Sequence, residues 1–258
     1  MKNMPLVTAG AILVVIAAIA FFALTRPVQK PAHTATPEEL AATQSRSYTE
    51  HGAYYDIATN YASRTLLRVD IGTAADDTAV AAMKDFITST VAQFKKDGKY
   101  ANLTAQDIQM RFSGGRKDAL NIVYLISTAP RTVSYIYTTY MDTGGAHGNT
   151  FFRTFTFDTK TGASLSLADL FTPDADYLMA LSKIARAKLP DMLKENMVPQ
   201  MLNDGTTPDA KNFANFFIDN DALKIQFAPY EVAPYSAGPQ TLYIPLSQLS
   251  SILKPEYQ

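Results

Sequence analysis

The sequence contains no cysteine, and histidine occurs only three times among its 258 residues. The lack of cysteine excludes disulfide scaffolds, iron–sulfur clusters, thiolate zinc sites and cysteine nucleophiles. Glycine (12) and proline (14) are too sparse for a collagenous or low-complexity chain. The formal net charge of -1 gives no basic surplus to hold phosphates, so nucleic acid is not an expected partner.

What the sequence does contain is typical of a folded protein. Hydrophobic residues make up 47% of it and charged residues 18%. This is enough material for one large or two small domains, and it excludes a disordered chain.

An uncharged apolar run extends from Met4 to Leu24. As a helix rising about 1.5 Å per residue, this run just covers a bilayer core of about 30 Å. We therefore expect residues 1–26 to be a transmembrane anchor or an uncleaved signal, which contacts the membrane through residues 4–24. A cleaved secretory signal is the alternative, because small residues at 18–20 and 23–25 have cleavage spacing.

The charges that flank the apolar run set its expected orientation. The positive charges of Lys2 and the terminal amine on one side nearly equal those of Arg26 and Lys30 on the other. The positive-inside rule therefore gives only a weak preference for either orientation. The short leading flank favours an N-terminus inside. We expect a single-pass protein of the cell membrane with an extracytoplasmic C-terminal domain, either periplasmic or extracellular.

Residues Arg26 to Ser47 hold three prolines and almost no large apolar side chain. Such a segment cannot bury enough surface to offset the entropy of folding. We predict a linker over residues 27–47. His33 lies inside it with no ligand-type partner at helical or hairpin spacing.

The first half of the remaining chain predicts strands around one long helix. From Tyr54 to Ile71 aromatic and aliphatic residues alternate as in one or two strands. A helix is predicted from an N-cap at Asp76–Thr78, with apolar residues three and four apart, to a stop at Asp97–Gly98. The strands predicted after it are Ile108–Ser113, Leu120–Thr128, Thr132–Met141 and Phe151–Asp158.

The last of these strands, Phe151–Asp158, has one mainly apolar face. Phe151, Phe155 and Phe157 point to one side, together with Arg153, and the other side is mostly polar. A face of this kind must be covered, and an amphipathic helix is the natural cover.

The second half predicts three helical segments and three strands. Helical signals occur at Ala168–Phe171 and Asp174–Leu189, where Pro190 is expected to end the helix. The remaining predicted elements are strands Phe213–Ile218, Leu223–Phe227 and Thr241–Ile244 and a final helix at Leu246–Leu253. The fold class is therefore α+β, with largely antiparallel sheets, helices packed on one side and two subdomains.

The common catalytic signatures are absent: the sequence has no GxSxG, HExxH, Walker A or GxGxxG motif. His51 and Glu50 are adjacent and point to opposite faces of an extended chain, so they cannot chelate together. We predict no catalytic residue, no metal ligand and no cofactor. The alternative is a hydrolase that uses carboxylates such as Asp142, Asp158 or Asp169 with His147.

A dense glycine cluster lies between two predicted strands, at Asp142–Thr150. Three glycines in five positions let backbone amides turn inward, a geometry that can receive an anion, a sugar hydroxyl or a partner's backbone. The candidate binding residues here are Gly144, Gly145, His147 and Asn149. The structural alternative is a wide hairpin whose polar side chains only bond the loop internally.

A second candidate surface is the segment Pro229–Pro239, which contains three prolines and two tyrosines. Its composition suits an exposed contact loop with little ordering cost. Tyr230, Glu231 and Tyr235 are the candidate residues, and simple packing is the alternative.

Three segments together resemble a known extracytoplasmic module. They are TGGAHGNT (Thr143–Thr150), FTFDTKTGASLSLADLF (Phe155–Phe171) and FAPYEVAPYSAGPQTLYIPLSQL (Phe227–Leu249). The chain resembles the module that is shared by the RsiV anti-sigma factors and the N-terminal part of the PdaC deacetylases. The resemblance covers roughly residues 48–253.

The resemblance implies a PdaC-like domain at 48–150 and an RsiV C-terminal-like domain at 151–258. RsiV-like ectodomains bind lysozyme, and in PdaC a separate metal-dependent deacetylase domain follows the module. Neither the sigma-binding segment of RsiV nor the metal-binding histidines of that deacetylase domain is expected in this sequence. We therefore predict a membrane-anchored, non-catalytic envelope protein that recognises a lysozyme-like muramidase or peptidoglycan; the alternative is a peptidoglycan-modifying hydrolase or a deacetylase-associated protein.

Overall fold

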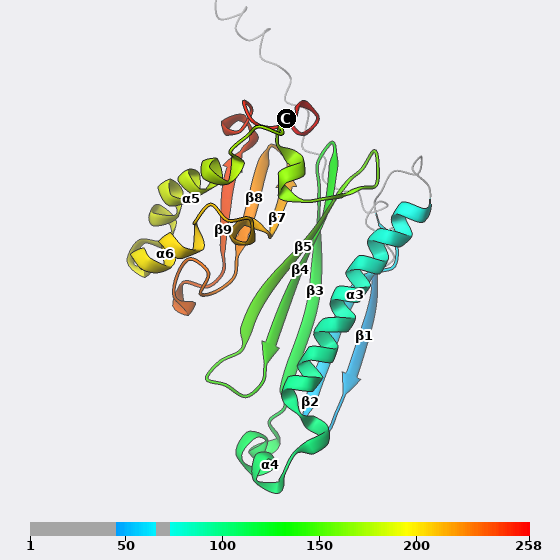
Figure 1. The fold of residues 1–258 in the computed structure, drawn as a ribbon. Coiled ribbons are helices and arrows are strands. Elements are labelled where there is room, and N and C mark those ends of the chain that lie inside the picture. The colour runs from blue at the N-terminus through cyan, green and yellow to red at the C-terminus, as the bar shows by residue number, and fades with distance from the viewer. Residues whose placement is uncertain (1–44, 66–72) are drawn as a thin grey trace, which may run out of the picture. The chain divides into compact units, whose positions relative to one another are not determined.

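The computed structural model describes residues 45–65 and 73–258, which form an α+β fold (Figure 1). The strands are β1 (Ser45–His51), β2 (Tyr55–Ala62), β3 (Asp118–Thr128), β4 (Thr132–Asp142), β5 (Asn149–Asp158), β6 (Ser164–Leu165), β7 (Phe216–Asp219), β8 (Ala222–Phe227) and β9 (Gln240–Pro245). The α-helices are α3 (Thr73–Gly98), α4 (Ala105–Arg111), α5 (Tyr177–Leu193) and α6 (Pro199–Gly205).

The first sheet has six strands in the order β1-β2-β3-β4-β5-β6. All neighbours pair antiparallel except β2 and β3, which are parallel. A parallel pair needs a long crossover connection, and α3 lies in that connection. The expectation of largely antiparallel sheets is confirmed, with this one parallel pair as the addition.

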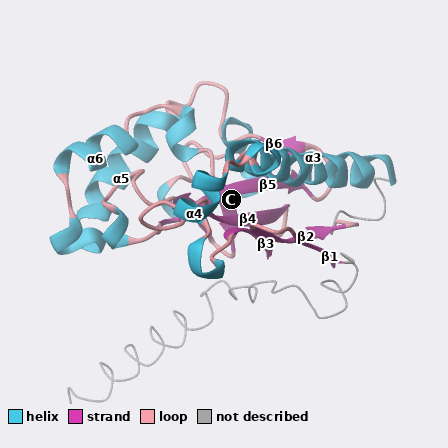
Figure 2. Ribbon diagram, turned by 90° about the horizontal axis from the view of Figure 1, so that it is seen from below, coloured by secondary structure: helices cyan, strands magenta, loops and turns pink. Residues whose placement is uncertain are grey.

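Helix α3 covers one face of the first sheet (Figures 1 and 2). The ring of Phe86 lies 5.6 Å from that of Tyr137 on β4 and 5.9 Å from that of Phe155 on β5. Phe155 belongs to the face that the sequence predicts to be apolar. The prediction that a helix must cover this face is confirmed.

A cluster of polar groups fastens the end of α3 to β1. Lys95 Nζ lies 2.7 Å from both carboxylate oxygens of Glu50. The hydroxyls of Tyr48 and Tyr55 donate to the same carboxylate. These donors stabilise the charged form and lower the pKa of Glu50 to about 2.

The second sheet has three antiparallel strands in the order β7-β8-β9. Helix α5 packs beside β9, where Lys188 Nζ donates to the Tyr243 carbonyl at 3.0 Å. This contact gives a partner to one backbone carbonyl of β9, which is an edge strand of the second sheet.

Side-chain hydroxyls attach the second sheet to the first. On the face of the first sheet that α3 does not cover, Ser and Thr hydroxyls donate to alternate carbonyls along the edge of β7 and the residues just before it. The bonds are Ser127 to Ile218 at 3.1 Å, Thr156 to Phe216 at 3.3 Å and Thr154 to Ala214 at 3.4 Å. The unpaired edge of β7 is thus satisfied by the face of another sheet, and both sheets belong to one unit of the chain.

The predicted strand at Ile108–Ser113 is wrong, because most of it lies in α4. Alternating apolar residues gave the strand pattern, but a capping box starts a helix four residues earlier. Asp107 N–H donates to the Thr104 hydroxyl at 3.1 Å, and the Thr104 N–H donates to the Asp107 carboxylate at 2.9 Å. The capping box therefore makes this segment a helix, although apolar residues alternate in it as they do in a strand.

Two expectations for the second half are also corrected. Pro190 does not end α5, which continues to Leu193, and the N–H of Lys194 bonds to the Pro190 carbonyl. A proline in the last turn removes only its own N–H, so the turn still closes. The predicted final helix at Leu246–Leu253 is only a 3-10 turn at Leu246–Gln248, followed by a strand-like bridge from Leu253 to Phe171.

The expected anchor at residues 1–26 and most of the linker at 27–47, with His33, lie outside the described residues. Within residues 45–65 and 73–258, no helix has the length and apolarity to span a bilayer. Strand β5 contains residues on both sides of the expected division at residue 150. The domain boundaries stay a prediction.

We predict that Thr156→Val destabilises the protein by about 1–3 kcal/mol. Thr156 is 2% exposed, and its loss leaves the Phe216 carbonyl and the Ser134 hydroxyl, 2.9 Å from it, without that partner. Chemical denaturation measures the change. Thr138→Val is the control: Thr138 lies on the neighbouring strand β4, on the same face of the first sheet, but is partly exposed, so the change should alter stability by less than about 0.5 kcal/mol. Equal effects of the two variants would contradict the docking role of Thr156.

Candidate functional site

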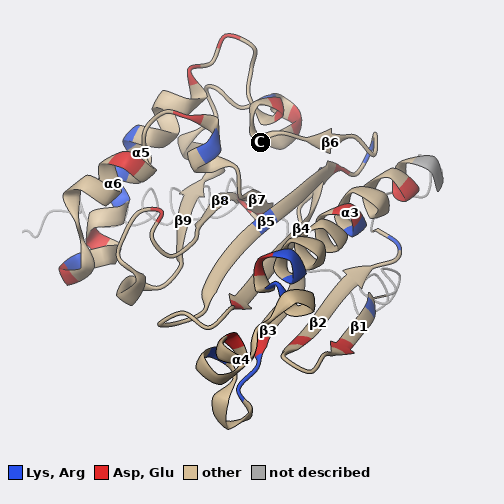
Figure 3. Ribbon diagram, turned by 60° about the horizontal axis from the view of Figure 1, so that its bottom comes forward, with Lys and Arg blue, Asp and Glu red and all other residues tan. Residues whose placement is uncertain are grey.

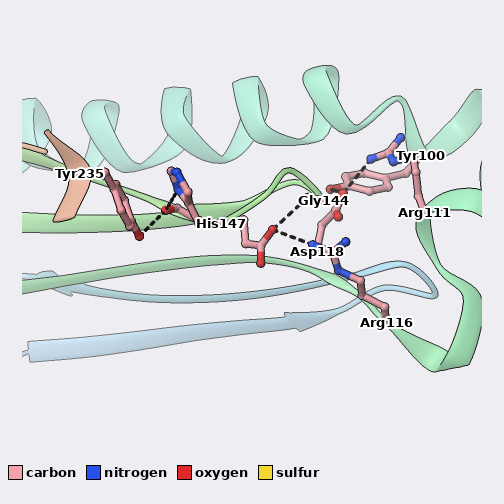
Figure 4. Close-up of polar contacts among 9 residues, drawn as sticks. Tyr100, Arg111, Arg116, Asp118, Gly144, His147 and Tyr235 are labelled. Atoms are coloured by element: carbon pink, nitrogen blue, oxygen red, sulfur yellow. Dashed lines mark hydrogen bonds and ion pairs between the residues drawn. The ribbon is translucent and has the colours of Figure 1, made fainter. Parts of the chain in front are cut away.

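Two loops from different sheets meet at one end of the molecule's first sheet. The glycine loop (residues 143–148) joins β4 to β5, and the proline loop (residues 228–239) joins β8 to β9. The Tyr235 hydroxyl donates to the Gly148 carbonyl at 2.9 Å across the two loops (Figure 4). The sequence marked each loop separately, and the structure brings them together.

Three rings from these loops form an aromatic cluster: His147, Tyr230 and Tyr235. The imidazole of His147 stacks on the ring of Tyr235, with centroids 3.7 Å apart and planes 21° apart. The ring of Tyr230 lies 6.2 Å from His147 and 5.7 Å from Tyr235. The cluster presents aromatic faces and polar groups on adjacent loops.

Hydrogen bonds fix the imidazole of His147 within the cluster. Its Nδ1 lies 3.0 Å from the Gly148 carbonyl, which can only accept, so Nδ1 carries the proton. In the neutral ring Nε2 is then an acceptor, and the Tyr230 hydroxyl 3.2 Å away donates to it.

Tyr230 is held in an unusual conformation. Its φ is 74°, in the left-handed region that bulky residues rarely adopt, and it is 52% exposed. Strained backbone of this kind concentrates at functional sites, where it places a side chain that relaxed geometry would not. The Tyr230 side chain is exposed and contributes little to the hydrophobic core, so core packing does not explain this strained conformation.

Glu231 supports the proline loop from within. Its carboxylate accepts the Ala228 N–H at 2.7 Å, and desolvation of the carboxylate raises the pKa of Glu231 although the residue as a whole stays exposed. At the end of α6, a Cβ on Gly205 would come within 1.9 Å of the Glu231 carbonyl oxygen. The backbone of the loop therefore rests directly on α6, and Glu231 acts on the cluster by positioning Tyr230.

The other candidates of the glycine loop have distinct places. Gly144 N–H donates to Asp142 Oδ1 at 2.9 Å, Gly145 is exposed, and Asn149 is an exposed residue at the start of β5. Gly148 is buried, and a Cβ there would lie 2.4 Å from the Tyr140 ring. Only a glycine lets the ring approach so closely.

An ion-pair cluster lies beneath the glycine loop (Figure 4). Asp118 is fully buried, and its Oδ2 accepts from Arg111 and from the Tyr100 hydroxyl, each at 2.8 Å. Burial and the bond to Asp118 raise the pKa of Tyr100. Arg116 bonds to Asp142 at 3.1 Å at the start of the loop. These bonds give the glycine loop a rigid base.

The carboxylates considered for acid–base chemistry do not converge on His147. The Asp142 carboxylate accepts hydrogen bonds from Arg116 and from the Gly144 N–H. Asp169 caps the 3-10 turn Leu167–Leu170. Asp158 is the last of the ten residues of β5, so about 30 Å of strand separates it from the glycine loop. In residues 45–65 and 73–258, no group of three or more His, Asp or Glu side chains could hold a metal ion.

Charges of both signs are spread over the elements around the site (Figure 3). Helices α3 and α5 each contain both basic residues and aspartates.

Residues 168–247, which contain the second sheet and the proline loop, match the family model described as "Protein of unknown function (DUF3298)". This chain contains a DUF3298 domain. A solved DUF3298 family member from Bacteroides fragilis is 21% identical, with a TM-score of 0.54, and the match covers 82% of this chain and 93% of that one. At this identity the likeness shows the fold alone.

Two curated relatives extend the match beyond the DUF3298 domain. The peptidoglycan-N-acetylmuramic acid deacetylase PdaC of Bacillus subtilis is 36% identical over 177 residues, which are 68% of this chain and 36% of PdaC. Esterase Rv3036c of Mycobacterium tuberculosis is 25% identical over 169 residues, 65% of this chain and 70% of the relative. The chain thus carries a PdaC-like module and spans about a third of the length of PdaC.

The site joins the DUF3298 domain to the part of the module before it. Tyr230 and Tyr235 belong to the domain, and His147 precedes it. Sequence reasoning missed Gly205 and Tyr140, which support the two loops by close approach. The periodicity of the sequence does not reveal residues that act by close approach. Gly205 gives only a weak signal, as an isolated glycine at the end of a helix.

We predict that Gly148→Ala destabilises the protein by about 1–3 kcal/mol, because its methyl group would overlap the Tyr140 ring. Gly145→Ala is the matched control in the same loop. Its Cβ would meet nothing closer than 3.8 Å, so the change should stay within about 0.5 kcal/mol. Thermal unfolding of both variants measures the difference, and equal shifts would contradict the close packing of Gly148.

Proposed function

We propose that the described part of the chain is a non-catalytic recognition module of the cell envelope that binds peptidoglycan through the aromatic cluster. In this proposal the apolar segment Met4–Leu24 anchors the chain in the cell membrane and the module lies outside the cytoplasm. The observation that carries the proposal is the exposed Tyr230, held at a left-handed φ beside His147 and Tyr235.

The chemistry of the cluster suits a glycan. The faces of aromatic rings are electron-rich and attract the polarised C–H groups of a pyranose ring. Around the rings, the Tyr230 hydroxyl and the exposed Asn149 amide offer hydrogen bonds to sugar hydroxyl and acetamido groups. Apolar faces with a few placed polar groups are the usual composition of a small-ligand site.

The relative PdaC supports a wall ligand. Its name describes an enzyme that acts on N-acetylmuramic acid of peptidoglycan, and the shared segment is 36% of its length. We propose that this shared module places its protein on the glycan strand, in PdaC as well as in this chain.

A muramidase that attacks the wall is the second candidate partner. Exposed tyrosines are frequent hot spots of protein interfaces, and Tyr140 is 40% exposed on the strand beside the glycine loop. This surface gives a protein partner an aromatic contact next to the cluster. Lysozyme should therefore be tested beside peptidoglycan in the binding assay.

Hydrolysis is the less favoured proposal. A relative is named an esterase, but at 25% identity. Around His147 the structure provides a carbonyl and two tyrosines as ring and hydrogen-bond partners. A nucleophile activated by His147 needs a serine or carboxylate in hydrogen-bond reach, and Asp158 and Asp169 are engaged elsewhere.

We predict that Tyr230→Gly abolishes binding to purified sacculi while the melting temperature stays the same or rises. Glycine adopts a φ of 74° without strain, and an exposed ring contributes little stability. The assay is co-sedimentation of the full-length chain, purified in mild detergent, with sacculi, and a parallel pull-down with lysozyme.

The control is Tyr243→Ala, which removes a tyrosine of similar exposure (45%) on β9. It should bind sacculi as the parent chain does. Retention on lysozyme but not on sacculi would transfer the proposal to the muramidase. Binding to neither, or a changed muropeptide profile after incubation, would refute it.

A further inference from the structure

The first sheet ends in an edge strand whose outer side pairs with no described strand. Strand β1 lies at that edge (Figure 1), and β2 is its partner on the inner side. All seven residues of β1 pair with β2 in one unbroken register, from Ser45–Ala62 to His51–Asp56. Six of the seven are exposed. Strand β1 therefore offers a regular row of outward backbone groups to a further strand.

Natural edge strands usually carry a feature that prevents such pairing. The sequence of β1, SRSYTEH, contains neither proline nor lysine, and its register with β2 shows no bulge. The opposite edge of the same sheet is protected by its shortness, because β6 has only two residues. Charge is the remaining protective feature, and the two charged side chains of β1, Arg46 and Glu50, are of opposite sign. They do not protect the edge against a strand of matching charge.

The outward backbone groups belong to alternate residues of β1. Gly52 N–H donates to the Tyr55 carbonyl at 2.8 Å, so the Gly52 N–H points toward β2. Directions alternate along an antiparallel strand, so the even-numbered residues of β1 also bond to β2. The odd-numbered residues direct their N–H and C=O groups outward: Ser45, Ser47, Thr49 and His51.

The sequence of β1 is complementary to itself about Tyr48. In an antiparallel pair of two β1 strands centred on Tyr48, Arg46 of each copy lies opposite Glu50 of the other. Ser47 lies opposite Thr49, and both are outward residues, so they form a hydrogen-bonded pair. Opposite charges, hydroxyl pairs and aromatic pairs are all favourable across strands. A shift by two residues in either direction removes both Arg–Glu pairs, so charge selects this register.

The Glu50 carboxylate is already held in place for this contact. It binds Lys95 Nζ at 2.7 Å and accepts the hydroxyls of Tyr48 and Tyr55. Lys95 belongs to α3, so Glu50, and by alternation Tyr48 and Arg46, lie on the α3 face of the sheet. The Glu50 side chain retains 25% exposure, which leaves it accessible to a further cation on that face.

We propose that two copies of this chain form a dimer by antiparallel pairing of their β1 strands about a two-fold axis at Tyr48. The two first sheets then form one continuous sheet, and the contact closes on itself because both copies use the same surface. The glycine loop lies at the His51 end of β1, so the two aromatic clusters stand at opposite ends of the joined sheet. This inference goes beyond the recognition function and does not rest on it.

The pairing is tested by sedimentation of the full-length chain in mild detergent over a range of concentrations. We expect a dimer that dissociates on dilution. Arg46→Glu sets like charges opposite each other twice and should raise the dimer dissociation constant about tenfold or more. Arg46→Lys should retain the dimer. Lys160→Glu, at an exposed position in the turn before β6, makes the same change of net charge and should have no effect.

A cysteine cross-link tests the register, because the parent chain contains no cysteine. In the proposed pair the two Cα atoms at position 48 lie about 4.5 Å apart, within the span of a disulfide. Those at position 45 are six residues apart along the joined strands, or about 20 Å. With oxidised glutathione, Tyr48→Cys should therefore form a covalent dimer and the control, Ser45→Cys, should form very little.

Three results would overturn the proposal: a monomeric parent chain, a dimer that Arg46→Glu leaves unchanged, or equal cross-linking of the two cysteine variants. A monomeric parent chain whose binding to sacculi or lysozyme is lost in Arg46→Glu would assign the edge of β1 to that ligand instead. Tyr230→Gly should leave the dimer intact, so a failure of the glycan proposal and a failure of this one are distinguishable.

Discussion

Hydroxyl groups on the face of one sheet hold the edge strand of another, and the position of the site follows from this attachment. Ser127, Thr154 and Thr156 donate to carbonyls along β7, so the second sheet has a fixed register on the first. Each bond contributes only about 1 kcal/mol net, but a lost donor leaves a buried carbonyl unpaired. That asymmetry makes the arrangement specific as well as stable.

The aromatic cluster is a consequence of the same arrangement. His147 comes from the first sheet and the two tyrosines from the second, so neither sheet carries the cluster alone. The Tyr235–Gly148 bond and the stacked rings join the loops, while Glu231, Gly205 and the Asp118 ion pair support them from below. Rigid support of this kind lowers the entropy that a ligand must overcome on binding.

Much of this architecture could be predicted from local patterns. The spacing of apolar residues predicted α3, and alternation predicted β3, β4 and β5 within two residues at each end. Composition alone marked the glycine and proline loops. These predictions succeeded because each depends on neighbours in sequence, such as one buried face or one turn.

The rest depends on contacts between distant residues. Strand β1 is exposed along nearly its whole length, so it has no apolar alternation that would reveal it. The parallel pairing of β2 and β3, the docking of β7 and the meeting of the two loops require knowledge of topology.

The most direct test of the account is an NMR titration of the full-length chain with soluble peptidoglycan fragments. The account predicts that the ring signals of His147, Tyr230 and Tyr235 shift together and saturate, and that the fragments are recovered intact. Shifts confined to other surfaces, or chemical conversion of the fragments, would contradict it.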